Sequence, residues 1–397
     1  MAAVKLDKYV KFGSSDMYVS EVCLGTMTWG SFNDEAATFA QLDKAVEMGV
    51  NFIDTAEMYP VPLNPKYINR TEILIGKWLE ARTASSSVDR SKIYIATKVC
   101  GNALANFPPA ALPNFRACVA GRADPLGDRP PADFDPESGP LPATTSEEML
   151  TACKASLQRL RCEYIDLYQL HFPQRYVPGF GKVEYRPEKE QPDDAPTSAH
   201  FDRIVLGLKA LLDAKLIKYW GLSNETSFGI MSFCAACDRH GVPRPVSVQN
   251  DVCLMNRGFE QETAEVCRHY DIAGMPYGAL AGGTLSGKYN GDEGQEPPSK
   301  KARHEQFPKF QPRYHSEACK AAARKYSALA RKHNLTPTQL ALAWMRSRWW
   351  NTSVISGTTS VSQLEEYVGA FKIELSQEIL DAVDAIHKEC RNPNITE

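Results

Sequence analysis

The stretch Asn51–Tyr59, NFIDTAEMY, decides the fold, because it places a carboxylate and a phenol directly behind a short apolar run. Residues 51–53 are predicted to form a buried strand, Asp54 stands at its end, and Tyr59 follows on a loop. Taken alone, this pattern also fits an Asp that caps a helix and a half-buried surface Tyr. The stretch therefore indicates a site only if other strands support it.

Two later apolar runs end in the same way. Residues 93–97 (IYIAT) are followed by Lys98, and residues 165–170 (IDLYQL) are followed by His171. Parallel strands of one sheet bring their carboxyl ends to the same edge, and in a (β/α)8 barrel that edge carries the active site. The three runs therefore predict that their terminal side chains converge with the phenol in one site.

Strands and helices alternate along the rest of the chain. Apolar runs bounded by turn residues predict eight strands, at 23–25, 51–54, 92–97, 165–170, 217–222, 246–249, 272–277 and 352–356. Helical spacing of apolar residues predicts ten helices, at 35–48, 71–81, 145–160, 202–213, 226–239, 260–270, 316–333, 337–348, 361–369 and 377–390. The order predicts an α/β fold, a (β/α)8 TIM barrel with an N-terminal β-hairpin at 9–22 and two extra helices.

Three stretches interrupt the alternation without a clear period. They are loop insertions at about 101–143, 173–200 and 282–315. The first two follow the carboxyl ends of strands, where barrel enzymes carry their substrate loops. We therefore expect one domain, 1–397, whose insertions surround the mouth of the barrel.

Composition excludes several classes of function. A net charge of −3 gives no basic footprint for nucleic acid, and no apolar run approaches the roughly 18 residues of a membrane span. The first residues lack a signal-peptide pattern, so a cytoplasmic protein with reduced thiols is expected. Cys234 and Cys237 form a CxxC inside a helical pattern and are interpreted as core thiols, and no set of metal ligands occurs. No pattern identifies an oligomeric interface.

The four converging side chains favour proton donation to a carbonyl oxygen. An ammonium at Lys98 is expected to lower the pKa of Tyr59, so that the phenol becomes a usable general acid. Asp54 can hold Lys98 in place, and His171 can orient the same substrate oxygen. Such a site protonates an alkoxide as it forms, and the missing hydride donor implies a nicotinamide cofactor.

A series of ordered segments then reveals a resemblance. The segments are GTMTWG (25–30), DTAEMYP (54–60), ATKV (96–99), DLYQLHFPQR (166–175), FGKVEY (180–185), GLSNET (221–226), LAGGTLSGKY (280–289) and ISGTTSVSQLEE (355–366). With these segments the chain resembles the aldo-keto reductases, and among them the bacterial Tas-type branch. The resemblance implies NADPH-dependent reduction of aldehydes or ketones, with Tyr59 as the acid and with Asp54, Lys98 and His171 completing a tetrad.

The resemblance also implies a set of residues that bind NADP(H). They are Thr26, Met27, Asp54, Ser223, Asn224, Gln249, Tyr277, Gly278, Ala279, Leu280, Gly282, Gly283, Ser286, Lys288, Arg303, Gly357, Thr358, Thr359, Gln363 and Glu366. The strand assignment places Trp29 and Met58 at the mouth, where they are expected to line the pocket of a small-molecule carbonyl substrate with Tyr59 and His171. The chain departs from the family pattern at Gln363, where some branches carry Arg, and at Tyr367, where much of the family has Asn.

Two other functions fit parts of the sequence. Some relatives in the family bind NADP and act mainly as regulatory partners, so a cofactor-sensing subunit with little turnover is an alternative. Residues 282–288 also spell GxxxxGK, the start of a phosphate-binding loop, but Tyr289 stands where magnesium binding needs Ser or Thr. Turnover of many cofactor equivalents separates a reductase from a sensor, and binding of ATP with magnesium identifies an NTPase.

Overall fold

The computed structural model describes residues 5–62, 64, 66–100, 146–190, 196–290, 302–308 and 310–396. Eight of its strands form one sheet in which every neighbouring pair is parallel, in the order β10-β3-β4-β5-β6-β7-β8-β9. They are β3 (Val22–Gly25), β4 (Phe52–Asp54), β5 (Tyr94–Val99), β6 (Ile165–Leu170), β7 (Ile217–Ser223), β8 (Ser247–Gln249), β9 (Ala273–Gly274) and β10 (Val354–Ser356).

The sheet curls until its two outer strands meet. Gly274 of β9 forms a parallel bridge with Asn351, and the N–H of Thr352 donates to the Gly274 carbonyl at 2.9 Å. The N–H of Ile355 in β10 donates to the carbonyl of Pro276, also at 2.9 Å. Because these bonds join the last two strands, the sheet closes, and the predicted (β/α)8 barrel is confirmed.

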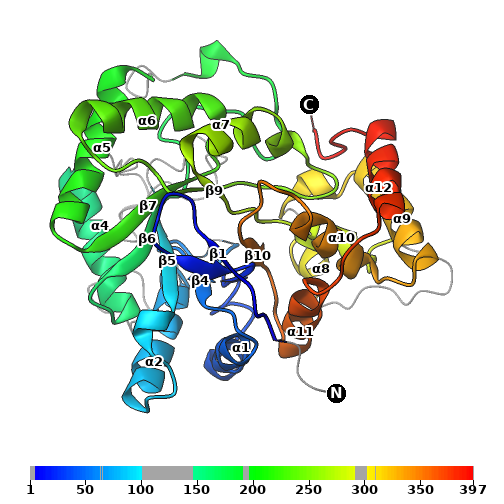
Figure 1. Cartoon of the computed structure of the whole chain (residues 1–397), viewed down its shortest axis with the longest axis horizontal. Coiled ribbons are helices and arrows are strands. Elements are labelled where there is room, and N and C mark those ends of the chain that lie inside the picture. The colour runs from blue at the N-terminus through cyan, green and yellow to red at the C-terminus, as the bar shows by residue number, and fades with distance from the viewer. Residues whose placement is uncertain are drawn as a thin grey trace.

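Helices surround the strands, with α4 to α7 over one side of the barrel and α9 to α12 over another (Figure 1). They are α1 (Glu35–Glu47), α2 (Arg70–Ala84), α4 (Ser146–Leu160), α5 (Ser198–Asp213), α6 (Ser227–His240), α7 (Glu262–Tyr270), α8 (Arg303–Gln306), α9 (Glu317–Lys332), α10 (Pro337–Arg346), α11 (Val361–Ala370) and α12 (Gln377–Glu389). Short 3-10 turns are η1 (Arg90–Lys92), η3 (Pro187–Lys189), η5 (Gly258–Glu260), η6 (Ala281–Ser286) and η7 (Pro312–Tyr314). All ten predicted helices are present, with ends shifted by a few residues, whereas α8 is an addition.

The N-terminal hairpin closes one end of the barrel. Its strands β1 (Tyr9–Lys11) and β2 (Tyr18–Ser20) pair antiparallel, and Phe12 packs edge-on against Phe52 with ring centroids 5.2 Å apart. The turn contains Gly13 at φ +53, and a Cβ there would lie 2.3 Å from a backbone carbonyl, so only glycine fits. The cluster formed with the strands comprises Phe12, Met17, Val19, Cys23, Phe52, Ala96, Leu167, Val246, Ala273 and Met275.

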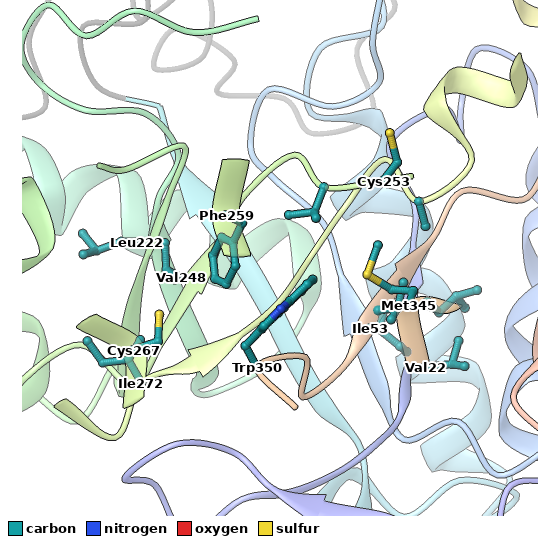
Figure 2. Packing of buried hydrophobic residues seen from close by; sticks show 14 of the residues in the cluster. Val22, Ile53, Leu222, Val248, Cys253, Phe259, Cys267, Ile272, Met345 and Trp350 are labelled. Atoms are coloured by element: carbon teal, nitrogen blue, oxygen red, sulfur yellow. The ribbon is translucent and has the colours of Figure 1, made fainter. Parts of the chain in front are cut away.

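The main core lies between the outer faces of the strands and the helices. Figure 2 shows part of it, including Ile53 and Val248 from the sheet and Phe259 beside Trp350. The rings of Phe259 and Trp350 are 5.0 Å apart between centroids. Each large apolar side chain buried here contributes roughly 1.5–3 kcal/mol, so the strands that carry such residues on their outward faces are anchored to the helical layer.

The structure differs from several of the predicted element bounds. β5 extends to Val99, so Lys98 lies inside the strand rather than after it, and β9 is limited to Ala273–Gly274 instead of 272–277. Pro276 has no N–H to continue the ladder, although the N–H of Tyr277 still donates to the carbonyl of Asn250 at 3.0 Å. The predicted insertion at 173–200 contains η3 and the start of α5, and the one at 282–315 contains most of η6, together with α8 and η7. The predicted insertion at 101–143 lies outside the described residues.

The cysteines follow the prediction where the structure describes them. Cys234 and Cys237 are both buried in α6 as free thiols, and burial raises the pKa of each to about 12. Thiols with such pKa values are unreactive at neutral pH, so their role is packing. In the part of the chain that the structure covers, no helix is long and apolar enough to cross a bilayer.

Candidate active site

The inward-facing side chains change from apolar to polar one layer above the hairpin. Along a strand, every second residue faces the same side. The residue two positions after one that packs in the hairpin cluster therefore points into the barrel again. The lower apolar and upper polar residues of three strands are Phe52 and Asp54 in β4, Ala96 and Lys98 in β5, and Leu167 and Gln169 in β6. The sheet register therefore brings Asp54 and Lys98 together, as predicted from the sequence.

Lys98 forms a buried ion pair at the centre of this layer. Its Nζ lies 2.6 Å from Asp54 Oδ2 and also donates to the carbonyl of Thr55 at 2.9 Å. The exposed fractions of the two charged side chains are 0% and 2%. Burial lowers the pKa of Lys98, and Asp54 opposes that shift. A buried charge of this kind is tolerated because it is paired and hydrogen-bonded.

Two amides hold the second oxygen of Asp54. The Nε2 atoms of Gln169 and Gln249 donate to Asp54 Oδ1 at 3.1 and 2.9 Å. Gln249 was predicted to bind cofactor, and in the structure its amide nitrogen holds the carboxylate. Gln169 was not predicted, although a polar residue at an inward position of β6, two residues after Leu167, is the signal that could have identified it. Together the amides fix the carboxylate that positions Lys98.

Tyr59 lies beside this pair in a small apolar cluster. Lys98 Nζ donates to the Tyr59 hydroxyl oxygen at 3.3 Å, and the ammonium lies 4.8 Å from the ring centroid. The loop that carries Tyr59 follows β4 and bonds to β5, since the N–H of Glu57 donates to the carbonyl of Lys98 at 3.2 Å. The surrounding cluster comprises Ala56, Met58, Ile68, Cys100 and Phe172, with Met27 and Val61 packed against it.

The pKa of Tyr59 departs from the sequence-based expectation. Burial, followed by repulsion from the Asp54 carboxylate, raises this pKa well above its usual value, whereas a lowered pKa was predicted. The prediction was wrong because Asp54 neutralises the charge of Lys98 and because the phenol is only 6% exposed. Tyr59 therefore stays protonated at neutral pH and can give its proton only to a strong base such as an alkoxide.

The imidazole ring of His171 lies beside the ring of Tyr59. The two rings meet edge to face with centroids 5.7 Å apart, and the imidazole stacks on Phe172 at 4.5 Å. Burial, and then the charge of Lys98, lower the pKa of His171 well below its usual value, so the imidazole is neutral. Its Nδ1 atom is buried and has no hydrogen-bond partner among the residues described. The predicted tetrad of Asp54, Tyr59, Lys98 and His171 thus lies in one place.

Three predicted cofactor residues lie at or beyond the ends of adjoining strands: Ser223 ends β7, Asn224 follows it directly, and Tyr277 follows β9. Asn224, in the left-handed region at φ +56, donates through Nδ2 to the carbonyl of His171 at 2.9 Å and accepts from the Tyr277 hydroxyl at 2.6 Å. Ser223 donates to the carbonyl of Gln249 at 2.9 Å. These bonds tie the ends of β7, β8 and β9 to the strand that carries His171.

A segment of small residues follows Tyr277. Predicted members Gly278, Gly282 and Gly283 have φ values of +75, +66 and +108, which favour glycine. A Cβ on Gly283 would lie 3.0 Å from the Nζ of Lys288, so the ammonium rests directly over this backbone. The segment also contains the predicted residues Ala279, Leu280 and Ser286, and the Ser286 hydroxyl donates to the Gly283 carbonyl at 2.7 Å. The predicted residue Arg303 lies outside the segment, at the start of α8.

The last predicted cofactor residues lie at the start of α11. Gln363 accepts from the N–H and hydroxyl of Thr359 at 2.9 and 3.1 Å, and Glu366 accepts from Thr336 at 3.0 Å. The carbonyl of Thr358 accepts from the Trp29 indole at 3.4 Å. Gly357 precedes this helix, and a Cβ on it would meet no atom within 4 Å.

The residues predicted to lie at the mouth of the barrel are found in two different clusters. Met58 lies in the cluster around Tyr59, with Met27 packed against it, whereas Trp29 is fully buried in the main core beside α11. Thr26 donates its hydroxyl to the carbonyl of Asp54 at 2.8 Å and so fixes the end of β4. Tyr367, the departure from the family pattern, donates its hydroxyl to the Ile355 carbonyl at 3.0 Å and is buried.

The chain is similar to several known proteins. The chain is 36% identical over 381 residues to Protein tas of Escherichia coli strain K12, covering 96% of this chain and 98% of that protein. It is 29% identical to Probable aldo-keto reductase 1 of Glycine max, over 94% of this chain and 88% of the relative. An uncharacterized oxidoreductase of Bacillus subtilis, YrpG, is 25% identical over 96% and 95% of the two chains. The profile of the Aldo/keto reductase family matches residues 21–388, and the chain belongs to that family.

Proposed function

We propose that the protein reduces aldehydes or ketones to alcohols with NADPH. The observation that carries the proposal is the phenol of Tyr59, which lies 3.3 Å from the ammonium of Lys98 inside an apolar cluster. A protonated phenol beside a fixed cation is suited to giving a proton to an oxygen on which negative charge develops. The apolar surroundings exclude water, so the proton comes from the side chain.

Each member of the tetrad has a separate role in this proposal. Tyr59 transfers its hydroxyl proton to the carbonyl oxygen, and Lys98 stabilises the phenolate that remains. Asp54 holds Lys98 in position through the 2.6 Å contact. His171 is neutral and hydrogen-bonds the substrate oxygen, which orients the carbonyl toward Tyr59.

The side chains do not include a hydride donor, and the chain offers a place for one. Lys288 and Arg303 are half-buried and make no ion pair within the described residues, so both cations are available to an anionic phosphate group. Ser223 and Asn224 offer polar atoms to a carboxamide, and Tyr277 offers a ring face. A nicotinamide dinucleotide bound there supplies the hydride that reaches the carbonyl carbon.

Preference for NADPH over NADH is part of the proposal. The extra phosphate of NADPH needs a cation that is not already neutralised, and Lys288 and Arg303 meet this requirement. Burial, and then the charge of Arg303, lower the pKa of Lys288. A carbonyl substrate enters at the face of Tyr59 and His171, next to Met58.

The test measures consumption of NADPH with para-nitrobenzaldehyde, in parallel with NADH. Many turnovers with NADPH, and fewer with NADH at the same concentration, support the proposal. Tight binding of NADPH without turnover contradicts it and favours a cofactor-sensing subunit. Product analysis decides the reaction itself, because the alcohol must form in a one-to-one ratio with the NADPH consumed.

A further inference from the structure

Two of the segments that resemble the family carry charged residues that the proposed proton transfer does not use. DLYQLHFPQR (166–175) ends in Arg175, and GLSNET (221–226) contains Glu225. In the structure Arg175 donates to Glu225 twice, from Nη1 to Oε2 at 2.9 Å and from Nη2 to Oε1 at 2.7 Å. The exposed fractions of the two side chains are 4% and 1%, so this ion pair is nearly as deeply buried as the one in the tetrad.

The pair lies where the loops that follow β6 and β7 meet the starts of α5 and α6. The guanidinium carbon of Arg175 lies 5.6 Å from the ring centroid of Phe201 in α5 and 5.5 Å from that of Phe228 in α6. A Cβ on Gly229 would lie 2.1 Å from Glu225 Oε1 and 2.6 Å from Arg175 Nη2. The two head groups therefore rest directly against the backbone of α6, and a side chain at position 229 would displace them.

Further hydrogen bonds fix both the side chain and the backbone of Glu225. The N–H of Thr226 donates to Glu225 Oε1 at 2.7 Å, and Arg175 Nη2 donates to the Thr226 hydroxyl at 3.0 Å. That hydroxyl also caps α6, because it accepts from the N–H of Gly229 at 3.3 Å. The backbone N–H of Glu225 donates to Asn250 Oδ1 at 3.1 Å, and its carbonyl accepts from Asn250 Nδ2 at 2.9 Å.

The residues next to this pair are the ones that the proposed reaction uses. Asn224 directly precedes Glu225 and adopts φ +56. Its Nδ2 donates at 2.9 Å to the carbonyl of His171, which lies four positions before Arg175. A left-handed backbone at a residue other than glycine persists only when the surrounding structure holds it. The ion pair supplies such a restraint on both sides of the contact between Asn224 and His171.

Stability alone does not require charged groups at this place. Replacing a buried ion pair by apolar side chains of similar volume is often neutral for stability or even favourable. The charged pair adds a defined geometry, because the planar guanidinium fork holds both carboxylate oxygens at once. The pair is therefore better suited to fixing the positions of the two loops than to adding stability.

We propose that Arg175 and Glu225 are positioning residues, whose ion pair holds the loop of His171 and the loop of Asn224 in a fixed arrangement. Neither side chain belongs to the tetrad. His171 orients the substrate oxygen and Asn224 offers its amide to the carboxamide of the dinucleotide, so the pair sets how the two reactants lie relative to each other. The inference rests on the proposed function and adds two residues to it.

The test replaces both charges at once. The variant Arg175→Met/Glu225→Met keeps the approximate volume of the pair and leaves no unpaired charge in the interior. The matched control is Arg244→Met/Asp238→Met, at the other end of α6. That pair has the same bidentate form, with contacts of 2.8 and 2.7 Å, but its side chains are exposed.

The wild type and the two variants are compared in four properties. Amide hydrogen exchange in the free protein follows the N–H of Asn224, which donates to the carbonyl of Gln249 at 2.9 Å. Fluorescence titration gives the dissociation constant for NADP⁺, and kinetics with para-nitrobenzaldehyde and NADPH give kcat and KM. The thermal midpoint shows whether each protein is folded.

We expect Arg175→Met/Glu225→Met to keep a thermal midpoint near that of the wild type, while the N–H of Asn224 exchanges roughly tenfold faster or more. Its kcat should fall by roughly 10- to 100-fold, because a small misplacement of the reactants is that costly, and its affinity for NADP⁺ should weaken by a smaller factor. The control should match the wild type throughout. Either wild-type kcat or wild-type exchange at Asn224 in the folded variant overturns the inference and leaves the reductase proposal intact.

A second variant keeps the inference testable if the double replacement does not fold. Arg175→Lys retains the charge but replaces the planar fork by a single ammonium. Its kcat should fall by roughly tenfold or more while the thermal midpoint stays near that of the wild type, and wild-type kcat in Arg175→Lys contradicts the inference. A wild type without turnover overturns the proposed function, and the inference with it.

Discussion

The Nζ of Lys98 lies 2.6 Å from Oδ2 of Asp54, and neither side chain reaches water. The pair Lys209 and Asp213 on α5 shows the same 2.6 Å separation, but there the side chains are 41% and 65% exposed. The equal distances permit a direct test of what burial does to an ion pair. Removing one partner of a buried pair leaves an uncompensated charge in the interior, whereas an exposed charge is solvated by water.

We therefore predict that Asp54→Asn lowers the free energy of unfolding by about 3 kcal/mol and that Asp213→Asn lowers it by less than about 1 kcal/mol. Urea denaturation of the two variants at neutral pH, followed by circular dichroism, gives both values. Equal losses in the two variants would show that the Asp54–Lys98 pair adds nothing beyond an ordinary surface contact.

The proposed proton donor gives a prediction about activity. Tyr59→Phe removes the hydroxyl and keeps the ring in its apolar cluster, so we expect kcat to fall by roughly 10²–10⁴-fold. The affinity for NADPH, measured by fluorescence titration, should change little because the ring and its neighbours remain. Tyr18→Phe, at an exposed position on the hairpin, serves as the matched control and should keep full activity. Wild-type turnover in Tyr59→Phe would exclude the phenol as the acid.

A buried histidine gives a prediction about acid stability. His200 is 4% exposed, both ring nitrogens lack partners among the described residues, and burial lowers its pKa to about 4. The unfolded chain, with a pKa near 6.5, binds more protons between these two values, so stability is present above about pH 6.5 and is lost as the pH falls toward 4. At about pH 5 this single group removes about 2 kcal/mol.

His200→Leu should therefore flatten the decline of unfolding free energy between about pH 7 and about pH 5. His269→Leu, at an exposed histidine, should decline as steeply as the wild type. Urea titrations at several pH values compare the three proteins. The same slope in His200→Leu and in the wild type would contradict the assignment.

Two helical glycines should respond in opposite ways to the same substitution. A Cβ on Gly76 of α2 would lie 2.0 Å from the carbonyl oxygen of Arg159 on α4, whereas a Cβ on Gly369 of α11 meets nothing within 4 Å. We predict that Gly76→Ala costs about 1–3 kcal/mol because the helices must separate. Gly369→Ala should stabilise the protein by up to about 1 kcal/mol, since alanine is the better helix former. Thermal unfolding of both variants checks the signs.

The sequence predicted the barrel because its signals are local. Apolar alternation locates each strand, and a titratable residue at a strand end marks the active edge, so Asp54, Lys98 and His171 could be identified without coordinates. Thr336 and Gln339, three residues apart in the chain, form a capping box at the start of α10, which is a signal of the same local kind.

The features that could not be predicted from the sequence depend on contacts between residues that are far apart along the chain. Gln169 holds Asp54 because only β5 separates β6 from β4 in the sheet, and an inward polar residue on β6 does not by itself show which partner it meets. The direction of the Tyr59 pKa depends on how deeply the ring is buried and on which partner neutralises Lys98. Both follow from three-dimensional packing, which propensity and periodicity do not describe.

The closure of the sheet has a consequence for synthesis on the ribosome. Val22, in the first strand of the barrel, pairs with Val354 in the last, and the N-terminal hairpin packs on Val246 and Ala273. At about 5–20 residues per second, tens of seconds separate the emergence of the first strand from that of its final neighbour. Throughout that interval one edge of β3 and the apolar side of the hairpin remain uncovered, so the nascent chain exposes surfaces that favour aggregation until its last strand emerges.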